Sequence, residues 1–100
     1  MDFKLHLLPD FELDVDEVYK WYEQNVNEEL SLKFIDDLLE QLTFIEIQPK
    51  TLTKYKNNIR KINLKKFPYK ILFKVQGYNV IVFALFHHKQ NPKPFIKRKT

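Results

Sequence analysis

The sequence predicts an α+β domain in which a helical hairpin packs on a mainly antiparallel four-stranded sheet, in the order β-α-α-β-β-β. Over much of the first half of the chain, apolar residues recur at spacings of three and four, the period of amphipathic helices. Over much of the second half, apolar residues alternate with polar ones, as they do in strands. Because the chain has 100 residues, we expect one domain over residues 1–95 and a basic, flexible tail over residues 96–100.

The first half predicts one short strand and two helices. Apolar and polar residues alternate over residues 3–7, and Pro9 ends this strand. A helical period follows from about residue 10 to residue 26, with Asp10 as a candidate N-cap. A second apolar stripe over residues 30–45 predicts a second helix. Because the connection between the two is short, we expect an antiparallel hairpin.

The second half predicts three strands. Residues 49–58 are polar and show no period, so we expect a loop there. Alternation over residues 61–65 and again over residues 69–75 predicts two half-buried strands. Gly77, the only glycine, predicts a tight turn with a positive φ. Residues 80–86 are apolar at odd and even positions alike, as expected of a strand covered on both faces. No regular structure is predicted from residue 93 onward.

Composition excludes several kinds of chemistry. The absence of cysteine excludes disulfides, thiolate zinc sites and a cysteine nucleophile. One glycine is too few for a phosphate-binding glycine-rich loop, and no base is placed by spacing around Ser31. His87 and His88 are adjacent, so on a strand they would point to opposite faces and could not share a metal. We therefore expect no metal and no cofactor.

The expected location is the cytoplasm, without a membrane partner. The longest apolar run, residues 80–86, is far shorter than the ~20 residues that a membrane-spanning helix needs. Residues 1–8 carry charged and polar side chains and do not have the pattern of a signal peptide.

Charge is divided between the two halves of the chain. Residues 1–50 hold all 13 acids and four lysines, for a net charge of −9, whereas residues 51–100 hold 13 lysines and arginines, for a net charge of +13. This asymmetry predicts an anionic partner for the C-terminal half, with the alternative that the two layers neutralise each other. In the first case one contiguous basic face should contain the strand lysines. These are Lys61, Lys65, Lys70 and Lys74.

Cations interleaved with aromatic residues could hold phosphates by charge and stack bases on their rings. They are Arg60, Lys61, Lys65, Lys66, Lys70, Lys74 and Lys89, with Phe67, Tyr69, Phe73 and Tyr78. The alternative for each is an ordinary exposed lysine or core aromatic. Trp21 lies off the apolar stripe of its helix, and we expect the sheet or a loop to cover it partly.

Several segments resemble the RelE/ParE superfamily of toxins, and ParE-like members in particular. Residues 14–22 (Asp-Val-Asp-Glu-Val-Tyr-Lys-Trp-Tyr) are similar to the family's first helix and residues 33–38 to its second. Arg60-Lys61 followed by Phe67-Pro68-Tyr69-Lys70-Ile71 resembles a family strand, and residues 86–92 resemble its closing segment. The likeness covers about residues 3–95 and implies the same β-α-α-β-β-β fold.

The resemblance implies a toxin that a cognate antitoxin silences. RelE-like members cut mRNA on the ribosome, whereas ParE-like members poison DNA gyrase. Lys61 matches a catalytic lysine of the RelE branch and Lys70 matches an arginine. Asn63 and Gln90 stand where that branch has a second lysine and another arginine. Half of the cationic set is therefore missing.

We accordingly predict a ParE-like, non-catalytic inhibitor of an essential target, with DNA gyrase as the expected target. The residues expected to bind it are Arg60, Lys61, Lys65, Lys70, His87, His88 and Lys89. One alternative is a RelE-like, metal-independent endoribonuclease acting on ribosome-bound mRNA. Its candidate catalytic residues are Lys61, Lys70, His87, His88 and Lys89, with a histidine supplying acid and base chemistry near neutral pH. A second alternative is a degenerate, non-toxic domain that binds only the antitoxin, since Phe95 replaces a tryptophan of the ParE pattern.

Overall fold

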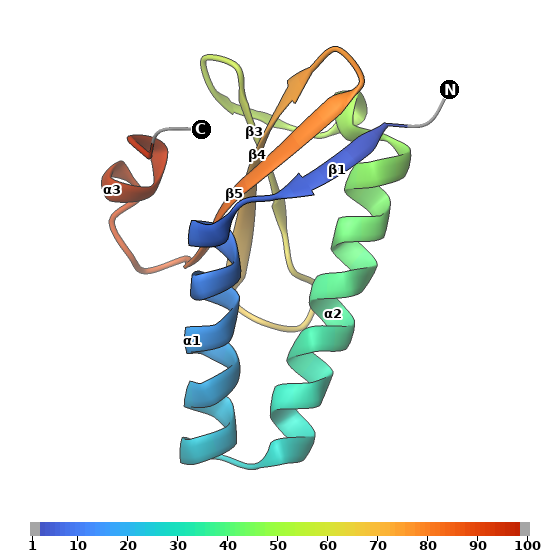
Figure 1. The fold of residues 1–100 in the computed structure, drawn as a ribbon. Coiled ribbons are helices and arrows are strands. Elements are labelled where there is room, and N and C mark those ends of the chain that lie inside the picture. Colours follow the sequence, from blue (N-terminus) through green and yellow to red (C-terminus); the bar gives the residue numbers. More distant parts are fainter. Residues whose placement is uncertain (1–2, 99–100) are drawn as a thin grey trace.

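The computed structural model describes residues 3–98, in which two long helices pack against one face of a five-stranded sheet (Figure 1). The predicted α+β class, the helical hairpin and the order of its elements are confirmed. In chain order the elements are β1 (Lys4–Leu7), α1 (Pro9–Asn25), α2 (Glu28–Ile47), the short 3-10 helix η1 (Pro49–Thr51), β2 (Lys54–Lys56), β3 (Ile59–Asn63), β4 (Tyr69–Gln76), β5 (Asn79–His87) and α3 (Lys93–Ile96).

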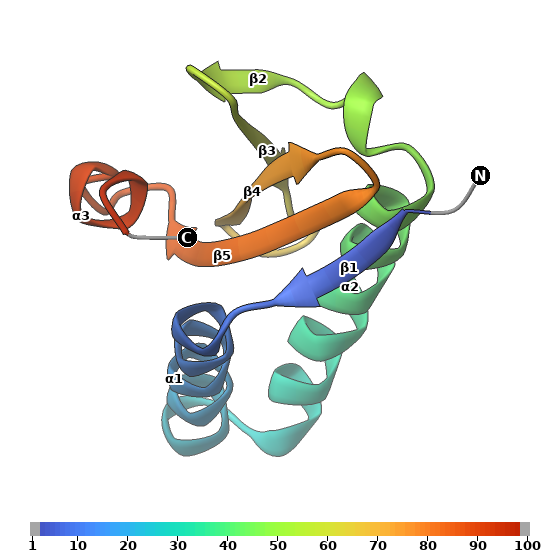
Figure 2. The same cartoon turned by 45° about the horizontal axis from the view of Figure 1, so that its top comes forward.

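The sheet has one strand more than predicted, and its order is β1-β5-β4-β3-β2. β1 runs parallel to β5, and the other pairs are antiparallel. The additional strand, β2, lies within the segment predicted as a loop, and the two residues Asn57 and Asn58 join it to β3 (Figure 2). Asn57 has a φ of 53°, which asparagine tolerates better than most residues do. The positive φ predicted for Gly77 in the β4–β5 turn is confirmed at 62°.

The two long helices begin differently. α1 begins at Pro9, with Leu8 at the N-cap position and no side chain capping it. The predicted N-cap, Asp10, is wrong, because proline suits the first helical position and places Asp10 inside the first turn. The Asn27 side chain caps α2, accepting a hydrogen bond of 2.8 Å from the Leu30 amide.

Apolar side chains form a cluster on each face of the sheet. The larger cluster joins both helices to the helix-facing side of the strands and contains Phe11, Phe34, Leu38, Leu42, Ile45, Ile71, Phe73, Val80, Val82 and Leu85 among its buried residues. The smaller one lies on the opposite side, which we call the outer face. Its buried residues are Ile59, Leu72, Phe83, Ala84 and Phe86, with Tyr55, Phe95 and Ile96 packed against them. The prediction that residues 80–86 are covered on both sides is therefore confirmed.

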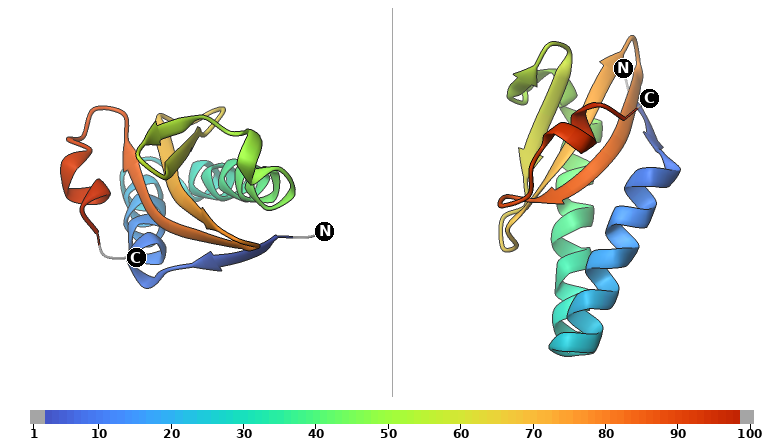
Figure 3. Two further views of the ribbon diagram at one scale, coloured as in Figure 1. Left: turned by 90° about the horizontal axis from the view of Figure 1, so that it is seen from above. Right: turned by 90° about the vertical axis from the view of Figure 1, so that its left-hand side faces the viewer.

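The C-terminal segment contains a short helix that the sequence does not predict. Residues 93–96 form α3, which lies beside the outer face (Figure 3), where Phe95 stacks on Phe86 with ring centres 4.8 Å apart. The guanidinium of Arg98 donates to both carboxylate oxygens of Asp14 in α1, at 2.6 and 2.9 Å. Such a bidentate pair orients both partners. Of the predicted flexible tail, residues 99–100 lie outside the described residues.

Candidate functional site

Lys61 and Lys70, which we call the cation pair, lie on the outer face. Lys61 is paired with Leu72 across the β3–β4 ladder and Lys70 with Asn63, so the two lysines are diagonal neighbours. The Nζ atoms of Lys61 and Lys70 lie 5.2 and 5.7 Å from the centre of the Tyr55 ring. Two cations therefore share one aromatic ring, which holds them close together.

Within residues 3–98, no acid compensates the positive charge of the cation pair. Among the ion pairs of the described residues, none involves Lys61 or Lys70. Burial lowers the pKa of Lys70, and the neighbouring charge of Lys61 lowers it further. An anionic group placed over Tyr55 would relieve this repulsion, so the pair is suited to binding one.

The repulsion within the pair predicts a measurable titration. We expect Lys70 to titrate below the usual range of lysine and Lys61→Gln to move its titration midpoint back toward that range. The side-chain resonances of lysine, followed by NMR across the alkaline range, report the midpoint directly. Lys66→Gln, which removes an equal charge from an exposed position outside the pair, should leave the midpoint of Lys70 unchanged. An unshifted midpoint in Lys61→Gln would contradict the coupling.

The predicted contiguous basic face is only partly correct. Lys74 lies on the outer face with the cation pair, its Nζ atom 5.7 Å from the centre of the Phe83 ring. Lys65 does not belong to this face, because it follows β3 in a loop against α2 and pairs with Glu40 at 2.8 Å. Asp37 of α2 holds this loop by accepting hydrogen bonds from the backbone amides of residues 65 and 66, at 3.1 and 2.8 Å. Asp37 thus holds this loop on the helix-facing side of the sheet, away from the outer face.

His87 lies on the helix-facing side, opposite the cation pair. Its ring meets Tyr69 edge-on, with centres 5.2 Å apart, and Tyr69 packs against the helix-facing core. Tyr69 is paired with His87 in the β4–β5 ladder and Lys70 with Phe86, so side chains at neighbouring positions point to opposite faces. The sheet therefore separates the imidazole of His87 from the amine of Lys70.

The hydrogen bonds of His87 settle where its proton lies. Its Nδ1 accepts a hydrogen bond of 3.0 Å from the Lys89 amide, so the neutral ring carries its proton on Nε2. The Gln90 side chain accepts a bond of 2.8 Å from the His87 amide and closes the turn that follows β5. His88 lies in this turn, exposed, with its amide bonded to the Pro68 carbonyl at 2.9 Å, and Lys89 is also exposed.

A shallow pocket of about 290 Å³ lies beside His87 and is lined by Glu17, Val18, Trp21, Tyr69, His87 and Gln90. Trp21 is 54% exposed, and its ring makes a T-shaped contact with the Tyr22 ring, with centres 5.2 Å apart. Burial, followed by a hydrogen bond with Tyr22, raises the pKa of Tyr69 above its usual range. The Tyr69 hydroxyl therefore stays protonated at neutral pH and offers no general base to this pocket.

A groove of about 370 Å³ lies between the two long helices and below β1, and we call it the hairpin groove. Its apolar lining residues are Leu7, Phe11, Val15, Tyr19, Ile35, Leu38, Leu39 and Leu42, with Glu12 and Asp16 at its border. Leu39 is 53% exposed and Leu7 39% exposed. Exposed apolar side chains gathered in one groove are typical of a surface that a partner covers.

Comparison with known proteins identifies the family. The model of the ParE toxins of type II toxin–antitoxin systems matches residues 5–92. The chain belongs to this family. No curated protein sequence matches the toxin. The resemblance inferred from the sequence is thus confirmed at the level of the family.

Solved structures share the fold of the toxin at low sequence identity. A structure of the chromosomal ParDE system of P. aeruginosa superposes with a TM-score of 0.76 and 19% identity, covering 85% of this chain and 95% of that one. The RelBE2 toxin–antitoxin complex of Mycobacterium tuberculosis gives 0.56 and 7% identity, over 88% and 100% of the two chains. A double mutant of the E. coli toxin RelE in the free state gives 0.56 and 17% identity, with both chains fully covered.

Sequence reasoning missed two acidic residues that position these surfaces. Asp14 accepts from Arg98 and also from the Leu85 amide, at 3.0 Å, beyond the last β1 partner of β5. Asp37 is almost fully buried and holds the loop before β4. Each lies on the buried side of an acidic helix, and the sequence signal was a carboxylate falling close to the apolar stripe.

No helix within residues 3–98 is both long enough and hydrophobic enough to cross a membrane. In the same range, no group of three histidine or acidic side chains is placed to hold a metal ion. Ser31 is buried, and its hydroxyl donates to the Glu28 carbonyl at 2.7 Å, which gives it a role in the first turn of α2.

Proposed function

We propose that this toxin acts as a non-catalytic inhibitor of DNA gyrase and that a cognate antitoxin neutralises it. One observation carries the choice between inhibitor and nuclease. The cation pair and His87 lie on opposite faces of the sheet, an arrangement that disfavours their joint action on one phosphate.

Cleavage of RNA without a metal has three requirements. A base must activate the ribose 2′-hydroxyl, cations must stabilise the phosphorane and an acid must protonate the leaving oxygen. Lys61 and Lys70 could meet the second requirement only in part, because the residue opposite Lys70 is the neutral Asn63. Gln90 is neutral as well, and its side-chain oxygen is used in the turn after β5. Loss of one preorganised donor typically lowers a rate by about 10²- to 10³-fold, so two such losses favour a binding role.

The alternative function is a RelE-like endoribonuclease acting on ribosome-bound mRNA. One observation favours it, namely the lowered pKa of Lys70, which brings that amine closer to the range useful for proton transfer. Lys61, Lys70, His87, His88 and Lys89 would then be its catalytic candidates. A degenerate, non-toxic domain remains the third alternative and predicts no growth arrest at all.

The antitoxin is proposed to bind the hairpin groove. An amphipathic helix or strand laid between α1 and α2 would bury the exposed parts of Leu7 and Leu39. Glu12 and Asp16 at the border favour basic residues on the edges of that segment. The groove lies on the helical layer, so an antitoxin bound there would leave the outer face free unless it continues around the sheet.

The proposed function predicts growth arrest with inhibited supercoiling and intact mRNA. Induced expression should produce a DNA-damage response, and purified toxin should inhibit gyrase in a supercoiling assay. Primer extension on translated mRNA should show no new ends. Codon-phased cuts that disappear in His87→Ala or Lys61→Gln would contradict the proposal and establish the nuclease. Gyrase inhibition without such cuts would support it.

A further inference from the structure

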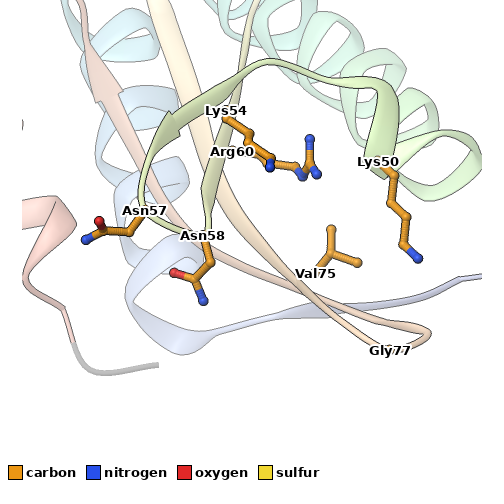
Figure 4. Close-up of a pocket in the computed structure, with 7 residues that line it drawn as sticks. All are labelled: Lys50, Lys54, Asn57, Asn58, Arg60, Val75 and Gly77. Atoms are coloured by element: carbon orange, nitrogen blue, oxygen red, sulfur yellow. The ribbon is translucent and has the colours of Figure 1, made fainter.

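A second cationic site lies at the edge of the sheet, away from the cation pair. A pocket of about 350 Å³ is formed where η1, the β2–β3 hairpin and the β4–β5 turn meet (Figure 4). Its lining residues are Lys50, Lys54, Asn57, Asn58, Arg60, Val75 and Gly77. Arg60 and Val75 belong to the helix-facing side of the sheet, so this edge pocket does not open on the outer face.

Two positive charges of the edge pocket lie next to each other, which is unfavourable. Lys54 of β2 is paired directly with Arg60 of β3 in the strand register. Like charges directly opposite each other in a sheet are destabilising. None of the described residues that line the pocket is acidic, and every acid of the chain lies within residues 1–50. An anion bound next to both side chains would offset this repulsion.

A hydrogen bond holds the Arg60 side chain in a fixed orientation. One of its terminal nitrogens donates to the Leu52 carbonyl at 2.8 Å, which fixes the guanidinium and leaves its other N–H groups available. In Figure 4 the guanidinium extends from β3 in the direction of the turn that carries Lys50. The Nζ atom of Lys50 lies 5.8 Å from the centre of the Phe3 ring, which helps to orient this third cation.

We propose that the edge pocket binds a phosphate group, supplied by a free nucleotide or by the backbone of a nucleic acid. Three cations around one opening match a multiply charged oxyanion better than a single carboxylate. A fixed guanidinium fork also offers the paired N–H donors that phosphate oxygens accept. Asn57 and Asn58 also line the pocket, and its volume is in the range of small-ligand sites. The site does not depend on which cellular target the toxin inhibits.

The test is a titration of the purified toxin with pyrophosphate, followed by NMR. Gly77 is the only glycine of the chain, so its amide resonance is readily identified. We expect saturable shifts of the Gly77 amide and of the Arg60 side-chain N–H, with an affinity that falls as salt rises. Arg60→Gln should weaken binding by about 10-fold or more, the effect expected for loss of a charge-assisted fork. Lys54→Gln should weaken binding too. Because Lys54 is exposed, this variant still tests the proposal if Arg60→Gln does not fold.

Two matched variants separate the edge pocket from general attraction to a basic protein. Lys93→Gln removes one exposed charge near α3, and Lys33→Gln removes one exposed charge from α2. Both should bind pyrophosphate as the unaltered toxin does. Equal weakening by all four substitutions, or no saturable shift at Gly77, would overturn the proposal.

Two further ligands identify the source of the phosphate. Adenosine monophosphate that binds more tightly than pyrophosphate, with loss in Arg60→Gln, supports a free nucleotide. A short single-stranded oligonucleotide that binds more tightly than pyrophosphate, loses this binding in Arg60→Gln and shows a steep salt dependence supports a nucleic-acid backbone. Tight binding of either ligand that Arg60→Gln and Lys54→Gln leave unchanged would place it elsewhere and overturn the proposal.

Discussion

Replacing Lys61 and Lys70 together by glutamine is expected to weaken gyrase inhibition by about 100-fold or more and to restore growth on induced expression. Each lysine lies over an aromatic ring without an acidic partner among the described ion pairs, so each is free to meet an anionic group of the target. A hydrogen bond to a charged group contributes about 1.5–3 kcal/mol, and about 1.4 kcal/mol corresponds to a tenfold change in affinity. A supercoiling assay with graded toxin measures the loss.

The control for this double variant is Lys65→Gln combined with Lys66→Gln. It removes the same net charge from exposed positions next to α2, where Lys65 pairs with Glu40. Exposed pairs of this kind contribute little to stability, so the control should fold and should remain toxic. Equal loss of inhibition in both double variants would show that net charge matters and the position of the cation pair does not. Unchanged inhibition in the first variant would remove the outer face from the proposed target site.

Leu39→Glu is expected to abolish neutralisation by the antitoxin while growth arrest persists. Leu39 is half-exposed in the hairpin groove, so the substitution should cost the free toxin little stability. In the complex, the added carboxylate would lie buried against apolar side chains and beside Glu12 and Asp16. A partner present at about 1,000 times its Kd stabilises a protein by about 4 kcal/mol, so the complex should raise the Tm strongly and the variant should lose this rise.

Phe44→Glu provides the matched control for the groove. Phe44 lies on the same helix and is 49% exposed, close to the value for Leu39, but does not line the groove. Co-expression of the antitoxin should therefore restore growth with Phe44→Glu and fail to do so with Leu39→Glu. Rescue of both variants would show that the antitoxin uses another surface.

Alternation along the strands predicted much of the outer face. It placed Lys61, Lys70 and Lys74 on one side of the sheet, because side chains of a strand point to alternate faces whatever the strand packs against. The same argument failed for Lys65, which lies beyond the end of β3. There the contact with Asp37 decides the path of the chain, and no local period reports a contact between residues 28 positions apart.

The short elements β2 and α3 have no clear local signal in the sequence and depend on contacts with other parts of the chain. β2 has three residues, too few to show a period, although the Asn57-Asn58 pair was a turn signal that could have indicated a hairpin. α3 has four residues, and it is held by the stacking of Phe95 on Phe86 and by the bond from Arg98 to Asp14. Propensity alone would not make so short a helix stable.

By itself the sequence determined the α+β class, the helical hairpin, the main strands, the division of charge and the family of the toxin. These follow from local periods and short motifs, which can be recognised in a segment without knowing what it packs against. Only the tertiary structure decided that the imidazole of His87 and the cation pair lie on opposite faces and that Lys54 and Arg60 meet at one edge. Both depend on strand register, which is set by packing across the whole sheet, and a shift of one residue would exchange the faces.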